Sequence, residues 1–219
     1  MKQLNAVIWD MDGVLVDTGR LHYDAWQSTL DEYSIAFDEA LFRQTFGMNN
    51  ETILRRLLGD RFSPALYDEI SGSKEERFRA ALPGNVTLFP GALPLLRALR
   101  EQGVAQAIGS SAPQPNIDAI VGELGIAGYL DAIVSAAEMP GKPDPVVFLT
   151  AAALLGARPR DCVVIEDTEA GIAAAQGAGM KCVAVATTNP VEALQTADLV
   201  VDGLEAIEPS RLLALVSTP

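Results

Sequence analysis

The chain of 219 residues has one histidine, His22, and two cysteines, Cys162 and Cys182. A single histidine excludes catalysis that needs two, and no Cys/His spacing typical of a zinc site occurs. Each cysteine opens an apolar run that is typical of a buried strand. We therefore expect two buried thiols rather than a disulfide, as in proteins of a reducing compartment.

The sequence also lacks long apolar runs and clustered positive charge. No stretch of 18 or more apolar residues occurs, so we expect no membrane span. Residues 1–10 have no apolar stretch followed by a cleavage site of the kind found in signal peptides, which predicts a cytoplasmic protein. There are 16 lysines and arginines against 29 aspartates and glutamates, a net charge of −13 that argues against nucleic-acid binding. Because no heptad or large apolar stripe is evident, we expect a monomer.

Short apolar, β-branched runs recur along the chain with helical patterns between them. Each run is nearly continuous in apolar residues, as expected for strands that are covered on both faces. The runs lie at residues 6–9, 104–108, 132–134, 163–165, 183–185 and 199–201. This alternation predicts an α/β fold with a doubly wound parallel sheet of the Rossmann-like type.

One long segment interrupts the alternation. Between about residues 17 and 82 no strand-like run occurs, and apolar residues such as Trp26 fall on helical faces. We therefore predict an all-helical cap domain at residues 17–84. It would be inserted into an α/β catalytic core domain formed by residues 1–16 and 85–219.

Polar residues follow four of the predicted strands. The carboxyl ends of parallel strands meet at one edge of a sheet, where ligands bind. In chain order these residues are Asp10 and Asp12, Ser110 and Ser111, Lys142, and Glu166 and Asp167. Clustered carboxylates need a cation, and hard oxygen ligands suit Mg²⁺. Each feature alone has a simpler explanation, as a loop acid, a solvated lysine or a helix cap, but all four in order favour an active site.

The chemistry that fits these residues is phosphoryl transfer. A carboxylate such as Asp10 can attack phosphorus and become an aspartyl phosphate. Ser110 and Lys142 would hold the phosphoryl oxygens that carry charge in the transition state. Asp12 lies two residues further along an extended chain and on the same side, where it can give a proton to the leaving oxygen and later take one from water.

The same residues carry a family resemblance. The run Asp10-Met11-Asp12-Gly13-Val14, followed by Asp17-Thr18, resembles the first motif of the haloacid dehalogenase superfamily. Ser110 is similar to the second motif, Lys142 to the third, and Glu166-Asp167 with Gly171 to the fourth. The helical insert resembles the cap of the phosphatase and sugar phosphomutase branch.

This resemblance implies a role for each residue. Asp10 would be the nucleophile and Asp12 the general acid/base. The resemblance implies that Mg²⁺ is bound by the Asp10 side chain, the Asp12 carbonyl, Asp167 and Glu166. A dehalogenase would need neither the acid at Asp12 nor the Glu166-Asp167 pair, which makes dehalogenation improbable.

The cap resembles that of β-phosphoglucomutase at several positions. His22 matches a histidine that couples cap closure to the acid/base aspartate, and Lys74 matches a cap lysine associated with specificity. Where the mutase has an arginine for the second phosphate of its substrate, this chain has Asn50. A neutral amide lacks the bidentate fork that suits a phosphate.

We therefore expect a Mg²⁺-dependent phosphatase for a small-molecule phosphate ester, such as a sugar or polyol phosphate. A β-phosphoglucomutase-type sugar phosphomutase is the alternative, and a non-catalytic binding module is a third hypothesis. The expected substrate-binding residues are Ser110, Ser111, Lys142, His22, Asn50 and Lys74.

Overall fold

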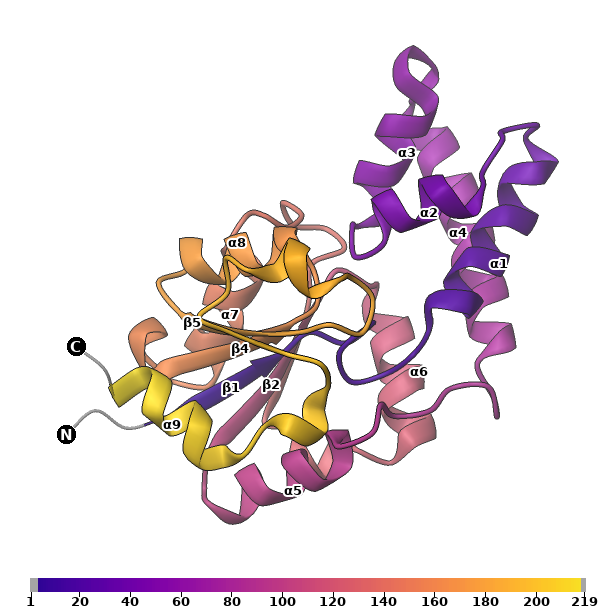
Figure 1. Ribbon diagram of the computed structural model, residues 1–219. Coiled ribbons are helices and arrows are strands. Elements are labelled where there is room, and N and C mark those ends of the chain that lie inside the picture. Colours follow the sequence, from indigo (N-terminus) through magenta and orange to yellow (C-terminus); the bar gives the residue numbers. More distant parts are fainter. Residues whose placement is uncertain (1–3, 218–219) are drawn as a thin grey trace.

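The computed structural model describes residues 4–217 and contains a six-stranded, fully parallel sheet (Figure 1). The strands are β1 (Ala6–Trp9), β2 (Ala105–Ser110), β3 (Ala132–Ser135), β4 (Cys162–Glu166), β5 (Lys181–Val185) and β6 (Leu199–Val201). All six apolar runs identified in the sequence form strands, which confirms the predicted α/β fold. Their order in the sheet is β3-β2-β1-β4-β5-β6. The direction of winding reverses between β1 and β4, and ligands bind at such a reversal in open sheets.

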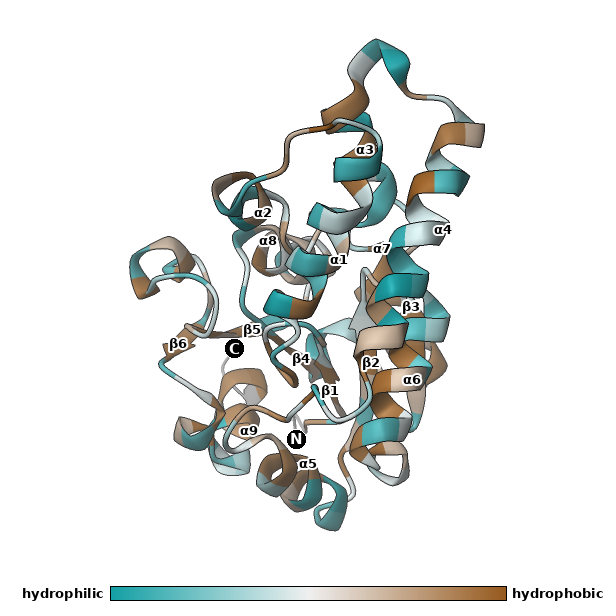
Figure 2. Ribbon diagram, turned by 90° about the vertical axis from the view of Figure 1, so that its right-hand side faces the viewer, coloured by the Kyte–Doolittle hydropathy of each residue, from teal (hydrophilic) through white to brown (hydrophobic). Residues whose placement is uncertain are grey.

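Helices cover both faces of the sheet, as expected for a doubly wound fold. On one face lie α5 (Ala92–Glu101), α6 (Gln114–Leu124) and α9 (Pro209–Ser217), and on the other α7 (Val146–Leu154) and α8 (Glu169–Gly177). The apolar clusters beneath them include Leu96 and Ile117 on the first face and Phe148 and Ile172 on the second. Short 3₁₀ turns are η1 (Gly59–Arg61), η2 (Ala127–Tyr129), η3 (Pro159–Asp161), η4 (Val191–Leu194) and η5 (Leu204–Ala206). Most strand residues are apolar and buried, as expected for a sheet that is covered on both faces (Figure 2).

The stretch predicted as a cap contains four helices and no strand. They are α1 (Gly19–Glu32), α2 (Glu39–Thr45), α3 (Asn50–Leu58) and α4 (Pro64–Ala81), and they stand apart from the sheet (Figure 1). Trp26, Leu54 and Ile70 belong to an apolar cluster of their own. The domain limits at residues 17 and 84 stay a prediction. Within residues 4–217, no helix combines the length and apolar character that a bilayer span requires.

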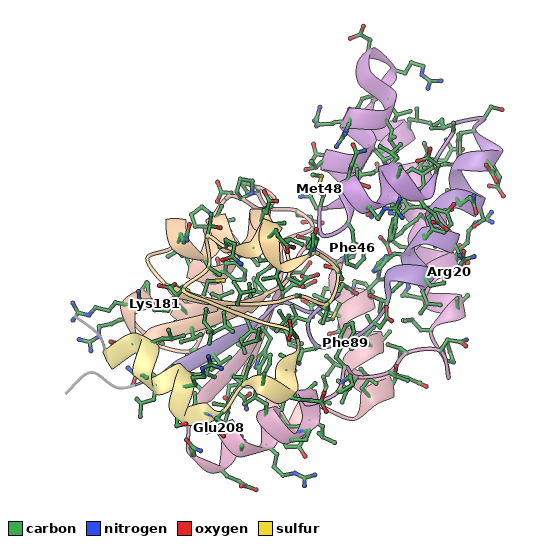
Figure 3. The ribbon with its side chains drawn as sticks, viewed as in Figure 1. Arg20, Phe46, Met48, Phe89, Lys181 and Glu208 are labelled. Atoms are coloured by element: carbon green, nitrogen blue, oxygen red, sulfur yellow. The ribbon has the colours of Figure 1, made fainter. Side chains whose placement is uncertain are left out.

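Two antiparallel chain segments join the cap helices to the sheet. Val16 pairs with Leu88 in an isolated β-bridge, and the amide of Phe89 donates to the carbonyl of Leu15 at 2.9 Å. Phe89 lies at the junction of the two parts (Figure 3). Phe78 at the end of α4 packs into the apolar cluster under the sheet. The cap is therefore held near the carboxyl end of β1, from which the first segment leaves.

Candidate active site

Asp10 follows the last residue of β1 and is 7% exposed. Its amide donates to the carbonyl of Ile165 in β4 at 2.9 Å, so the backbone of Asp10 is fixed at the winding reversal. Lys142 donates to Asp10 Oδ1 and, at 2.5 Å, to Glu166 Oε1. Burial raises the pKa of Asp10 to about 7, against the lowering effect of Lys142, and Glu166 raises it further. Burial alone would lower the pKa of Lys142, but these two carboxylates hold it above its ordinary value.

Three buried acids form one cluster. Asp10, Glu166 and Asp167 each offer a carboxylate oxygen, and these oxygens lie within 4.8 Å of one another. Glu166 Oε2 also accepts from the amides of Asp167 and Thr168, both at 2.8 Å. The helix-cap explanation of Glu166 is therefore correct in part, because this residue supports the start of α8 as well as Lys142.

Asp167 indicates what the cluster can hold. Its Oδ2 accepts from the hydroxyl of Thr188, while its Oδ1 is buried without a hydrogen-bond partner. Burial and the neighbouring Glu166 raise the pKa of Asp167 well above its ordinary value. A buried oxygen without a donor is costly, and a hard divalent cation would satisfy it. The donor set therefore fits a magnesium ion.

Two glycines make room for these acids. A Cβ built on Gly13 would collide with the Asp167 carboxylate, and one built on Gly171 would collide with the Glu166 carboxylate. Gly13 also has φ of +96°, a conformation that side chains disfavour. These contacts explain why glycine follows Asp12 and why glycine stands in the first turn of α8.

The two serines at the end of β2 lie in different surroundings. The pairing of β1 with β2 sets Trp9 opposite Ile108, so Ser110 lies one residue beyond the level of Asp10. Ser110 is buried, and its hydroxyl accepts from the amide of Ala112 at 3.1 Å, which leaves its proton free to donate. Ser111 lines the cavity between cap and core, and its buried hydroxyl has no partner. Both can therefore serve an anionic ligand.

Asp12 points toward the cap. Its Oδ1 accepts from the hydroxyl of Thr18 and lies 3.4 Å from His22 Nε2. Lys74 Nζ lies 3.0 Å from His22 Nδ1, so the ring accepts at Nδ1 and carries its proton on Nε2, toward Asp12. Burial and Lys74 lower the pKa of His22, which favours this neutral form. Burial would raise the pKa of Asp12, but the contacts from His22 and Thr18 leave it lowered.

Beyond Lys74 the same chain of contacts reaches Glu75. Lys74 donates to Glu75 Oε1 at 2.8 Å, and Asn50 donates to the same oxygen at 2.7 Å. Glu75 Oε2 accepts from Asn116 on α6, whose own carbonyl accepts from Arg79 at 2.9 Å. These bonds join α4 of the cap to α6 of the core.

The cavity lies between this network and the core. Asp12, His22, Asn50, Lys74, Glu75 and Ser111 line it, together with apolar residues of the loop between α2 and α3. Phe46 and Met48 of that loop lie where the cap faces the sheet (Figure 3). A ligand reaching Asp10 from this side would have Glu75 and Asn50 at its far end.

A family model for haloacid dehalogenase-like hydrolases matches residues 4–179, which includes every residue of the acidic cluster. The chain belongs to the haloacid dehalogenase-like hydrolase family. This finding confirms the resemblance found in the sequence and the prediction that the protein is an enzyme.

Relatives in this family include both a mutase and phosphatases. The chain is 34% identical to a beta-phosphoglucomutase of Bacillus subtilis (strain 168) over 206 residues, covering 90% of this chain and 89% of the relative. It is 30% identical to hexitol phosphatase A of Escherichia coli (strain K12), with 91% of each chain covered. The crystal structure of a beta-phosphoglucomutase from Clostridium difficile superposes with a TM-score of 0.88 at 28% identity, covering 98% of this chain and 97% of that one.

The structure of this haloacid dehalogenase-like hydrolase brings most predicted site residues together. Asp10, Lys142, Glu166 and Asp167 meet at the sheet edge, while Asp12, His22, Lys74, Asn50 and Ser111 lie at the cavity. No pattern in the sequence indicates a role for Glu75, Asn116 or Thr188. Adjacent residues on a helix do not normally face each other, so the position of Glu75 beside Lys74 gave no signal of a pair.

Proposed function

We propose that this chain is a Mg²⁺-dependent phosphatase that hydrolyses a small phosphorylated metabolite, a sugar or polyol phosphate, through an aspartyl phosphate on Asp10. The observation that supports this most strongly is the cluster of Asp10, Glu166 and Asp167, with an unpartnered buried oxygen on Asp167 and Lys142 beside it. We further expect a monomeric, cytoplasmic enzyme that acts on a small molecule rather than on nucleic acid.

Lys142 and Ser110 would hold the phosphoryl oxygens in the first step. One oxygen of Asp10 attacks phosphorus while the bond from phosphorus to the ester oxygen breaks. Asp12 takes up a proton from solvent, because its lowered pKa leaves it ionised, and gives that proton to the departing oxygen. Mg²⁺, held by Asp10, the Asp12 carbonyl, Glu166 and Asp167, would supply positive charge that offsets the repulsion between the carboxylate and the phosphate.

In the second step Asp12 takes a proton from water, and that water attacks phosphorus. The bond from phosphorus to Asp10 breaks, which releases inorganic phosphate and restores the carboxylate. His22 holds Asp12 by its Nε2–H during both steps, which ties proton transfer to the position of the cap. Asp12 contacts two residues of the cap side, Thr18 and His22, so its position depends on where the cap lies.

The nucleophile assignment is tested with Asp10→Asn. Release of phosphate from an aryl phosphate with Mg²⁺ should fall by at least about a thousandfold, since the amide cannot form the acyl phosphate. Wild-type protein should form an acid-stable, hydroxylamine-sensitive adduct with labelled phosphate, and the variant should not. Turnover of Asp10→Asn within tenfold of wild type would refute the assignment.

The mutase alternative is supported by the 34% identity to a beta-phosphoglucomutase. It is tested with β-glucose 1-phosphate and a trace of glucose 1,6-bisphosphate as activator. Isomerisation to glucose 6-phosphate much faster than phosphate release would favour the mutase. We expect the opposite, because Asn50 is neutral and its amide is committed to Glu75.

A further inference from the structure

The positive charge that lines the cavity forms an ion pair with a carboxylate of the cap itself. Among the described residues that line the cavity, Lys74 is the only lysine or arginine. Its ammonium lies 2.8 Å from Glu75 Oε1, 3.0 Å from His22 Nδ1, and 5.2 Å from the ring centre of Trp26. The lysine is 1% exposed, and its charge is balanced by that of Glu75. Lys74 is therefore not offered to a ligand as a free cation.

Glu75 is held in one orientation by three donors. Lys74 and Asn50 donate to Oε1, and Asn116 donates to Oε2. Burial would raise the pKa of this carboxyl, but Lys74, His22 and Asn50 together leave the pKa lowered, so the group is ionised at neutral pH. The carboxylate is 5% exposed and lines the cavity, and it cannot turn away without breaking the contact to α6.

We propose that Glu75 selects substrates by the charge of their distal end: the cavity takes phosphate monoesters whose far end carries hydroxyl groups and excludes those with a second phosphate. The proposal rests on the proposed function of the Asp10 site. It adds a specificity-determining residue and a narrower substrate class to that function.

The physical reason is the balance of charge around the distal group. A second phosphate would bring about two negative charges toward Glu75 and Asp12, with Lys74 already neutralised. Two like unit charges about 6 Å apart repel enough, at an effective dielectric constant of about 20, to weaken binding on the order of a hundredfold. Hydroxyl groups, in contrast, donate hydrogen bonds to a carboxylate and to the carbonyl of Asn50. Glu75 therefore penalises one class of ligand while assisting the other.

The matched ligands for the test are D-mannitol 1-phosphate and D-mannitol 1,6-bisphosphate. Mannitol has a twofold axis, so the two compounds differ only in the distal group. Dissociation constants are measured by calorimetry with Mg²⁺ in the Asp10→Asn background, which prevents turnover. The measured quantity is the ratio of the bisphosphate constant to the monophosphate constant.

In the otherwise native background the ratio should exceed ten. Glu75→Gln should lower it at least tenfold, because the carboxylate charge is lost and Lys74 becomes free to bind the distal phosphate. The matched control is Glu76→Gln, which removes an exposed acid one residue further along α4 and should leave the ratio within twofold. Asn50→Arg keeps Glu75 and brings a cation to its oxygen, so it should lower the ratio at least threefold and serves if Glu75→Gln does not fold.

A purely structural role for Glu75 would weaken both ligands in parallel and leave the ratio unchanged, which would overturn the proposal. A native ratio near one would overturn it as well. Both results concern binding, so they are independent of whether the wild-type enzyme releases phosphate. Failure of the proposed function would appear separately, as absent turnover of either mannitol ester by wild-type protein.

Discussion

Adding Mg²⁺ to metal-free protein should raise its melting temperature through the acidic cluster. Asp10, Glu166 and Asp167 bring three carboxylates within 4.8 Å, and Lys142 is the cation in contact with two of them. The unpartnered Oδ1 of Asp167 is the oxygen with most to gain from a ligand. At a Mg²⁺ concentration one hundred times its dissociation constant, linkage predicts a stabilisation of about 2.7 kcal/mol. For a chain of this size that corresponds to roughly 5–11 °C.

Asp167→Asn separates metal binding from a general effect of ionic strength. The variant keeps the shape of the side chain but removes one of the crowded charges. In EDTA its melting temperature should equal or exceed that of wild type, because like-charge repulsion is relieved. With Mg²⁺ its upward shift should fall below about 2 °C.

Differential scanning fluorimetry in EDTA and in a series of Mg²⁺ concentrations measures both quantities. Asp202→Asn is the control, since this exposed aspartate lies outside the cluster and its loss should leave the full shift. The reasoning is refuted if Asp167→Asn keeps the wild-type shift. It is equally refuted if the variant loses several degrees in EDTA, because Asp167 would then stabilise the metal-free fold.

Three further predictions concern stability and reactivity. Lys74 holds the pKa of Glu75 below its ordinary 4.5. The Lys74–Glu75 ion pair therefore stabilises the fold above about pH 4.5, and this stabilisation is lost as the pH falls through the lowered pKa. Glu75→Gln should flatten the loss of stability in acid, measured by circular dichroism. Iodoacetamide at pH 8 should not label Cys162 or Cys182 in the native protein, as detected by mass spectrometry. Burial raises the pKa of Cys162 to about 11 and that of Cys182 well above its ordinary value. Rapid labelling without denaturant would contradict this. Leu54 is fully buried in the apolar cluster of the cap. Leu54→Ala should lower the free energy of unfolding in urea by about 2–5 kcal/mol, whereas a loss below about 1 kcal/mol would mean that the cap is loosely packed.

The sequence by itself determined the strands and what stands at their ends. Six runs such as 163–165 are nearly continuous in apolar residues, many of them β-branched, a local pattern that is typical of a doubly covered parallel strand. Because parallel strands bring their carboxyl ends to one edge whatever their order, Asp10 and Asp167 could be placed together without knowing that β1 pairs with β4.

Only the tertiary structure decided how the cap completes the cavity. His22 and Lys74 are 52 positions apart, and their contact depends on how α1 and α4 pack, which no local pattern states. Glu75 is buried because α4 docks against Asn116 of α6, so the same acid would be a solvated charge on an isolated helix. Its neighbour Glu76 is exposed, although the two share residue type and helix. The residue types at the catalytic edge of the sheet follow from the sequence. The sign of the charge at the distal end of the cavity follows from long-range packing, because packing decides which carboxylate is buried and which cation it neutralises.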